Sequence, residues 1–168
     1  KELVRALVQE EGVKANATTV IDENLLDEVA GLVEYPVALT GNFDSEFLEV
    51  PAEALILAMK SHQKCFYLID ADKNLLPKFV TVSNIVSKDP AQVIEGNERV
   101  IRPRLADARF FFETDKQSTL ASRMEPLKKI VFQDKLGSVS DKSGRVAVLA
   151  KAIATELGAD PALCERAA

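Results

Sequence analysis

The stretch ALILAMKSHQKCFYLIDADKNLLPKFVTVS, residues 54–83, decides the fold that this sequence predicts. Its opening residues, up to Met59, are apolar on nearly every side, a pattern that favours a buried helix. Residues 64–70 and 78–83 follow as two predicted strands, joined by a polar loop around residues 70–74. A helix that packs against a strand pair is typical of an α+β fold.

The first predicted strand alternates between two faces, as the two-residue repeat of a strand requires. Cys65, Tyr67 and Ile69 fall on one face, whereas Phe66 and Leu68 fall on the other. We therefore expect a small β-sheet with packed helices in the middle of the chain.

The residues before this stretch predict two helices and a short strand. Residues 1–11 repeat apolar side chains at helical spacing and are followed by a glycine that ends the helix. Asp22 is placed to cap a second helix, which Pro36 prevents from continuing. Residues 37–40 then predict a strand, and residues 41–44 predict a turn.

The residues after it predict a mainly helical region. One helix is expected from Asp89 to about residue 115, a second over residues 118–129, and a third over residues 142–157 with Asp141 as its cap. We therefore place an α+β domain at residues 1–88, a long helical connector at residues 89–132, and the beginning of a further helical domain at residues 133–168.

Composition limits the functional classes. The chain has 168 residues, of which 47% are apolar and 28% charged, and both values are ordinary for a globular protein. The net charge of −5 means that any contact with nucleic acid must come from a local basic face. Cys65 and Cys164 are expected to be reduced thiols. No stretch approaches the roughly 20 apolar residues of a membrane span, so we expect a cytoplasmic protein.

Both ends of the sequence look cut, because it begins at Lys1 without a methionine and stops within a predicted helix. We therefore expect a fragment of a longer protein. No glycine-rich phosphate loop, CxxC, HExxH or nucleophile elbow is present. His62 is the single histidine, which excludes a multi-histidine metal site, and we expect no catalytic residue and no metal in this piece.

The stretch GNERVIRPRLADARFFFE, residues 96–113, predicts an amphipathic helix with an arginine stripe. Arg99, Arg102 and Arg109 share an arc of about 80°, opposite a predominantly apolar side. Guanidinium groups suit phosphate because they present several donors in a planar fork. The alternative is a solvated face, neutralised in part by nearby glutamates. The predicted apolar side comprises Val93, Ile94, Val100, Ile101, Leu105, Ala108, Phe111 and Phe112.

Arg104 falls inside this apolar arc, where an unpaired charge would be costly. Either it pairs with Asp107 one turn further on, or Pro103 shifts the phase of the helix and turns it outward. We predict a structural ion pair between Arg104 and Asp107.

A second polar cluster, residues 60–64 (KSHQK), lies where the predicted buried helix meets the first strand. His62, Gln63 and Lys64 offer donors to phosphates or base edges from a rigid base. The alternative is an ordinary connection between a helix and a strand.

Several blocks resemble the beta subunit of the bacterial glycyl-tRNA synthetase. They are EYPVALTGNFDSEFLEVPAEALILAMKSHQKCF, LLPKFVTVSN, EGNERVIRPRLADARFFFETD and KKIVFQDKLGSVSDKSGRV, in order from Glu34 to Arg145. The resemblance implies a heterotetrameric cytoplasmic ligase that joins glycine to tRNA(Gly). Its alpha subunit would bind ATP and carry the class II active site, while this piece holds no cofactor and contacts neither DNA nor membrane. The resemblance makes these residues tRNA-binding candidates: His62, Gln63, Lys64, Asn97, Arg99, Arg102 and Arg109.

The family's beta subunit also contains a helical segment related to HD phosphohydrolases, and residues 133–168 resemble its beginning. A working HD site needs histidines, whereas Gln133 stands beside Asp134 here. We expect a scaffold without phosphohydrolase activity. An HD-type metal-dependent phosphohydrolase and a purely structural domain remain the alternatives to a module for tRNA binding and subunit assembly.

Overall fold

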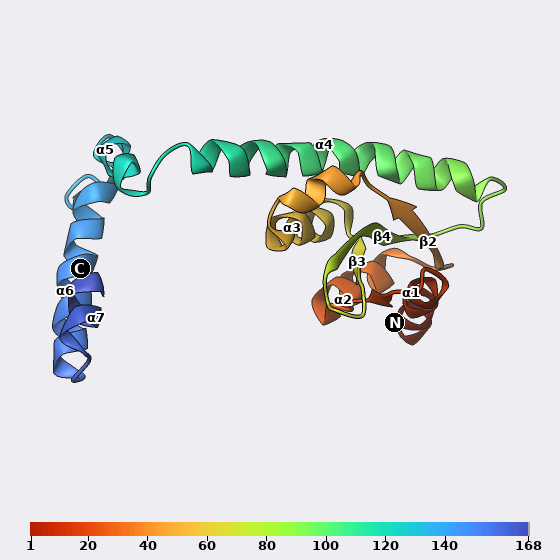
Figure 1. The fold of residues 1–168 in the computed structure, drawn as a ribbon, viewed down its shortest axis with the longest axis horizontal. Coiled ribbons are helices and arrows are strands. Elements are labelled where there is room, and N and C mark those ends of the chain that lie inside the picture. Colours follow the sequence, from red (N-terminus) through yellow and green to blue (C-terminus); the bar gives the residue numbers. More distant parts are fainter. Residues whose placement is uncertain (168) are drawn as a thin grey trace. The chain divides into compact units, whose positions relative to one another are not determined.

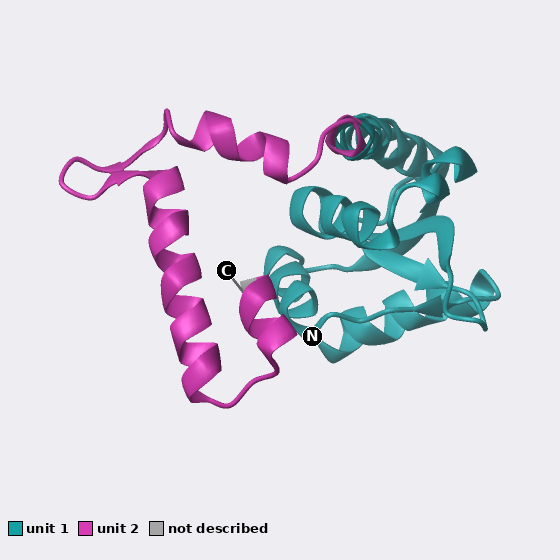
Figure 2. Ribbon diagram, turned by 60° about the vertical axis from the view of Figure 1, so that its left-hand side comes forward, with its two compact units in different colours: residues 1–113 teal, residues 114–168 magenta. Residues whose placement is uncertain are grey.

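The computed structural model describes the backbone of residues 1–167 and the side chains of residues 1–166 (Figure 1). The chain forms two compact units, residues 1–113 and residues 114–168 (Figure 2). None of the described helices combines the length and the apolar composition needed to cross a membrane.

The first unit is built on a four-stranded antiparallel sheet with the order β1-β3-β4-β2. This arrangement confirms the α+β prediction. In chain order its elements are α1 (Glu2–Lys14), β1 (Thr18–Thr19), α2 (Glu23–Leu32), β2 (Val37–Asn42), the 3-10 helix η1 (Ser45–Glu49), α3 (Ala52–Gln63), β3 (Phe66–Ile69), β4 (Leu75–Ser83) and α4 (Pro90–Lys116).

Strand β2 is longer than predicted, because it continues through two residues that the sequence placed in a turn. Gly41 pairs with Phe79 and Asn42 pairs with Lys78 on β4. A Cβ atom on Gly41 would lie 2.4 Å from Cζ of Phe79, so only glycine lets the strand pass this ring.

One face of the sheet is covered by α3, η1 and α4 (Figure 1). Phe79 of β4 and Cys65, which directly precedes β3, pack against buried side chains in or next to the covering elements, namely Phe47, Val50, Leu55, Ala58, Met59, Ile101 and Leu105. Helix α3 was predicted to be buried nearly all round, and this was wrong for Leu57. That side chain is 64% exposed, because only one face of α3 meets the sheet.

The opposite face is covered by α1 and α2 (Figure 1). Phe66 and Leu68 of β3 point to this side, whereas Tyr67 packs on the side of Phe79. The predicted alternation of β3 is therefore confirmed. The buried side chains on this side are Val4, Val8, Leu25, Leu26, Val29, Phe66, Leu68 and Val80.

Helix α4 runs without interruption through Pro103 (Figure 1). Pro103 has no N–H to donate to the carbonyl of Arg99, yet burial of Ile101 and Leu105 against the sheet holds the helix in place. Because these contacts join most of α4 to the first unit, the division between the units falls between Glu113 and Thr114. That point lies inside the connector that the sequence placed at residues 89–132.

The second unit consists of short elements and one longer helix (Figure 2). Where a helix was predicted over residues 118–129, only two short turns occur. Ser138, rather than Asp141, caps the long helix, and Asp141 completes a capping box from inside it. The elements are η2 (Ala121–Arg123), α5 (Met124–Leu127), β5 (Val131–Gln133), β6 (Gly137–Ser138), α6 (Val139–Glu156) and α7 (Pro161–Ala167), with β5 and β6 paired antiparallel.

Candidate nucleic-acid interface

The arginines of α4 stand on a firmly anchored helix. Ile101 and Leu105 are 1% and 0% exposed, and Phe112 packs against the same core. Side chains on the remaining sides of α4 are therefore presented from a fixed backbone.

Two arginines of the predicted stripe form ion pairs with carboxylates of residues 44–49, which comprise η1 and the residue before it. Nε of Arg102 lies 3.3 Å from Oδ2 of Asp44. Nη1 of Arg109 lies 3.1 Å from Oε2 of Glu46, and its Nη2 lies 3.5 Å from Oε2 of Glu49. These pairs are largely solvated, and such pairs typically contribute between zero and about 1 kcal/mol. Weak ion pairs within the chain thus neutralise part of the positive charge of the stripe.

Arg99 differs from its two neighbours in the stripe. It is exposed, and among the described residues no carboxylate lies within ion-pair distance of it. It lines a surface depression of about 310 Å³ with Glu95, Glu98 and Arg102. Oε1 of Glu98 accepts a hydrogen bond from the backbone N–H of Asn42 at 2.7 Å, so this carboxylate is already engaged. Arg99 is the stripe arginine without an ion pair in the described residues, and Glu95 lines the same depression.

The predicted ion pair of Arg104 and Asp107 is not present in the described residues, which corrects the sequence interpretation. Both side chains are exposed. The buried side of α4 is narrower than predicted and centres on Ile101 and Leu105, so Arg104 lies at its edge and reaches solvent. Asn97 is half-buried, and its Nδ2 donates to the carbonyl of Val93 at 2.8 Å.

The basic residues at the end of α3 connect this helix to α2. Nζ of Lys64 lies 2.8 Å from Oε1 of Glu28. Lys60 pairs with Asp22, and this pair, together with the N–H of Leu25, lowers the pKa of Asp22. These side chains line a depression of about 230 Å³ between the two helices. Both lysines therefore form ion pairs that link α3 to α2 and its capping residue.

His62, Gln63 and Lys64 do not act as one group. Lys64 has a left-handed backbone conformation with φ of 54°, which ends α3. His62 is exposed, Gln63 is half-buried, and the carbonyl of Gln63 accepts a hydrogen bond from Sγ of Cys65 at 3.4 Å. Burial raises the pKa of the Cys65 thiol to about 12. Of the three predicted residues, His62 is the one most open to a partner.

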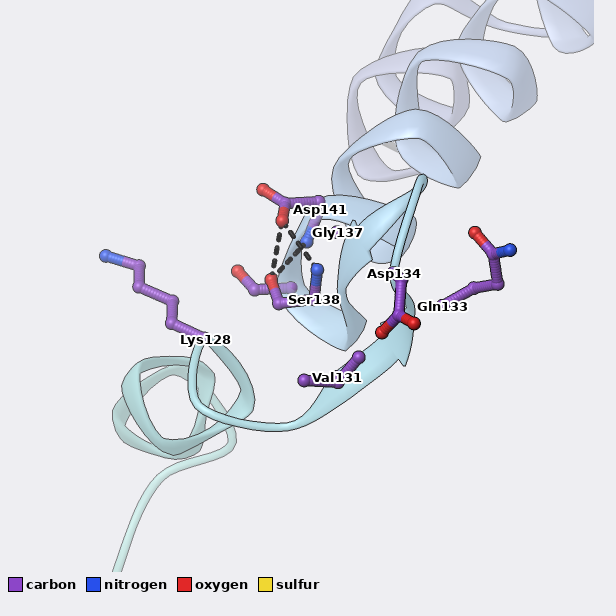
Figure 3. A pocket seen from close by; sticks show the side chains of 8 residues that line it. Lys128, Val131, Gln133, Asp134, Gly137, Ser138 and Asp141 are labelled. Atoms are coloured by element: carbon purple, nitrogen blue, oxygen red, sulfur yellow. Dashed lines mark hydrogen bonds between the residues drawn. The ribbon is translucent and has the colours of Figure 1, made fainter.

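A polar depression of about 500 Å³ lies in the second unit at the start of α6 (Figure 3). Ser138 and Asp141 bond to each other there, with Oγ of Ser138 donating to Oδ2 of Asp141 at 2.7 Å. Gln133 points away from this pair (Figure 3). No group of three or more His, Cys, Asp or Glu side chains within the part of the chain that the structure describes is arranged to hold a metal ion. The depression is largely the outer surface of a satisfied capping box.

Two features of the interface were missed in the sequence. Asp44, Glu46 and Glu49 lie far from the arginines in sequence, and no local pattern indicates that η1 lies beside α4. The second feature is the exposure of Phe110 and Phe111. Here a signal existed, because consecutive residues of a helix point about 100° apart and three phenylalanines in a row cannot share one buried face.

Comparison with known proteins agrees with the resemblance carried by the quoted motifs. A family model described as glycyl-tRNA synthetase beta subunit matches residues 1–168. The glycine–tRNA ligase beta subunit of Marinobacter nauticus is 62% identical over 165 residues, which cover 98% of this chain and 23% of that protein. The corresponding proteins of Chromohalobacter salexigens and Hahella chejuensis are 56% and 57% identical, over 100% and 99% of this chain and 24% of each relative. The chain therefore spans about a quarter of the length of these relatives, and it belongs to the glycyl-tRNA synthetase beta-subunit family.

Proposed function

We propose that this chain is a tRNA-binding and subunit-assembly part of a glycine–tRNA ligase. The observation that supports the tRNA contact most directly is Arg99, an exposed guanidinium without a carboxylate partner among the described residues, on the anchored helix α4. Because the backbone of α4 is anchored, phosphate binding orders only the Arg99 side chain itself, and each phosphate contact also gains from counterion release.

Arg102 and Arg109 contribute less than Arg99 in this proposal. Their partners Asp44, Glu46 and Glu49 must give way or share the guanidinium when a phosphate approaches. Because the pairs are solvated, the exchange costs little. His62 adds an exposed donor at the end of α3, whereas Lys64 remains engaged with Glu28.

In the whole enzyme, the alpha subunit would bind glycine and ATP and form the bond to tRNA(Gly), and the beta subunit would recognise the tRNA in the cytoplasm. This division of roles follows from the family and from the lack of any recognisable phosphate loop in the chain. The residues from Gln133 onward would act as a helical scaffold without HD-type chemistry.

The experiment uses full-length beta subunit assembled with alpha subunit, and measures tRNA(Gly) binding on filters over a series of KCl concentrations. Arg99→Ala should weaken binding by about 1 kcal/mol and reduce the slope of log K against log [KCl] by about 0.7 to 0.9. The matched control is Arg5→Ala, because Arg5 lies on α1 and is held by Glu23 at 2.8 and 2.9 Å. Equal slopes for wild type, Arg99→Ala and Arg5→Ala would contradict the proposed tRNA contact.

A further inference from the structure

The exposed surface of α4 carries two aromatic rings, Phe110 and Phe111, and two arginines without ion pairs in the described residues, Arg99 and Arg104. From this arrangement we infer that Arg99, Arg104, Phe110 and Phe111 form a stacking surface for unpaired nucleotides of RNA. The inference rests on the proposed tRNA contact and extends it, because it names the kind of RNA segment and adds residues that the arginine stripe does not contain.

The two rings are exposed to an unusual degree for phenylalanines. Phe110 is 65% exposed and Phe111 is 63% exposed, while the adjacent Phe112 packs against the core. The centroids of the two exposed rings lie 5.6 Å apart at an interplanar angle of 69°, so the rings meet edge to face. Edge-to-face contact is a favoured geometry of aromatic pairs, and the exposure of both rings leaves ring surface open to a further flat group.

Helical spacing aligns each ring with one of the arginines. Arg99 and Phe110 are eleven residues apart and therefore lie in one row along the helix. Arg104 and Phe111 are seven residues apart, close to two helical turns, and form a second row. Eleven residues are close to three helical turns and span about 16 Å. Each row therefore places cationic and aromatic groups along one side of the helix, over a length that can accommodate more than one nucleotide.

The arginines on this side of α4 differ from those on the side that faces η1 in whether they form ion pairs within the chain. Arg102 and Arg109 have carboxylate partners within the chain. Arg99 and Arg104 have none among the described residues, although Asp107 is exposed nearby. A protein partner would have to supply both acidic groups and flat apolar groups at matching positions. An unpaired RNA strand supplies both throughout, because every nucleotide carries a phosphate and a base with a π face.

The test compares the salt dependence of tRNA(Gly) binding by the assembled alpha–beta enzyme. Phe110→Ala and Phe111→Ala should each weaken binding about fivefold or more with an unchanged salt slope, because stacking releases no counterion. Phe111→Trp should retain the affinity of the wild type, since it keeps an aromatic face. Arg104→Ala should instead flatten the slope. Leu57→Ala is the matched control, because Leu57 is 64% exposed on α3 and should not change binding.

The outcomes separate this inference from the proposed function. If Arg99→Ala flattens the salt slope but both phenylalanine variants bind tRNA like wild type, the tRNA contact stands and the stacking surface is wrong. If none of these variants changes binding, both ideas fail. If a phenylalanine variant also weakens subunit assembly, its loss of tRNA binding has two explanations. A photo-crosslinking benzophenone side chain at position 111 of the assembled enzyme then identifies what this position contacts. An adduct with tRNA supports the stacking surface, and adducts with protein alone overturn it.

Discussion

The two units of the chain differ in how completely they bury the apolar side chains of their helices and strands. In the first unit, side chains from seven elements fill two cores on opposite faces of the sheet. In the second, Cys164 is the one buried apolar side chain among the described residues. Helix α6 leaves its large apolar side chains substantially exposed, including Val146, Val148, Leu149 and Ile153. Helical periodicity therefore predicts which residues share a face, but burial requires a second element to cover that face.

The largest expected effect comes from removing one large side chain in each unit of the 168-residue chain and comparing the changes in unfolding free energy. Phe79→Ala should cost about 3 to 5 kcal/mol of unfolding free energy, because Phe79 is fully buried at the centre of the sheet. Leu149→Ala should change stability by no more than about 0.5 kcal/mol, because Leu149 is 62% exposed. Both tyrosines, Tyr35 and Tyr67, lie in the first unit, so tyrosine fluorescence during urea unfolding reports on that unit.

Circular dichroism measured on the same samples follows the helices of both units and serves as the companion signal. A loss of several kcal/mol in Leu149→Ala would mean that α6 packs against a partner in solution. The contrast between the two units would then be wrong.

A smaller effect is expected when a glycine is replaced by alanine, and the change in stability should have opposite signs in the two units. Gly41→Ala should destabilise the chain by about 1 to 3 kcal/mol, because the new Cβ would lie 2.4 Å from Cζ of Phe79 and the ring has little room to move. Gly144→Ala should increase the helix content and stability of α6 by about 0.5 to 1 kcal/mol, because nothing lies within 4 Å of the new Cβ. Urea midpoints and far-ultraviolet ellipticity measure both effects, and the same sign for both substitutions would contradict the structure.

The local pattern of the sequence was enough to predict much of the first unit. The alternation in β3, the extent of α4 and the cap at Asp22 are short-range features, and all three are present. Short-range reasoning also located the arginine stripe, because Arg99, Arg102 and Arg109 are defined by helical phase alone.

The misinterpreted features depend on contacts between distant segments. The extra length of β2 requires Gly41 to meet the ring of Phe79. The neutralisation of Arg109 requires η1 to lie beside α4. The exposure of Arg104 depends on how wide a strip of α4 the sheet covers, and periodicity gives the centre of that strip but not its width.

The smallest expected effect concerns the charges that join α1 to α2. Hydrogen bonds from Arg5 and then Lys1 lower the pKa of Glu23 from 4.5 to about 2. The folded state thus binds a proton at Glu23 less readily than the unfolded state does. The stabilisation is present in full above pH 4.5, decreases below that pH, and is lost as the pH falls through about 2. Glu23→Gln removes it at every pH, so the difference in urea midpoint between wild type and Glu23→Gln, measured by tyrosine fluorescence, should be small at pH 7, should decrease below pH 4.5 and should vanish only below pH 2. Because Glu23 is a solvated surface carboxylate, 0.5 M NaCl should also reduce the difference at pH 7. A difference at pH 2 as large as that at pH 7 would show that Glu23 stabilises the first unit through packing rather than through its charge.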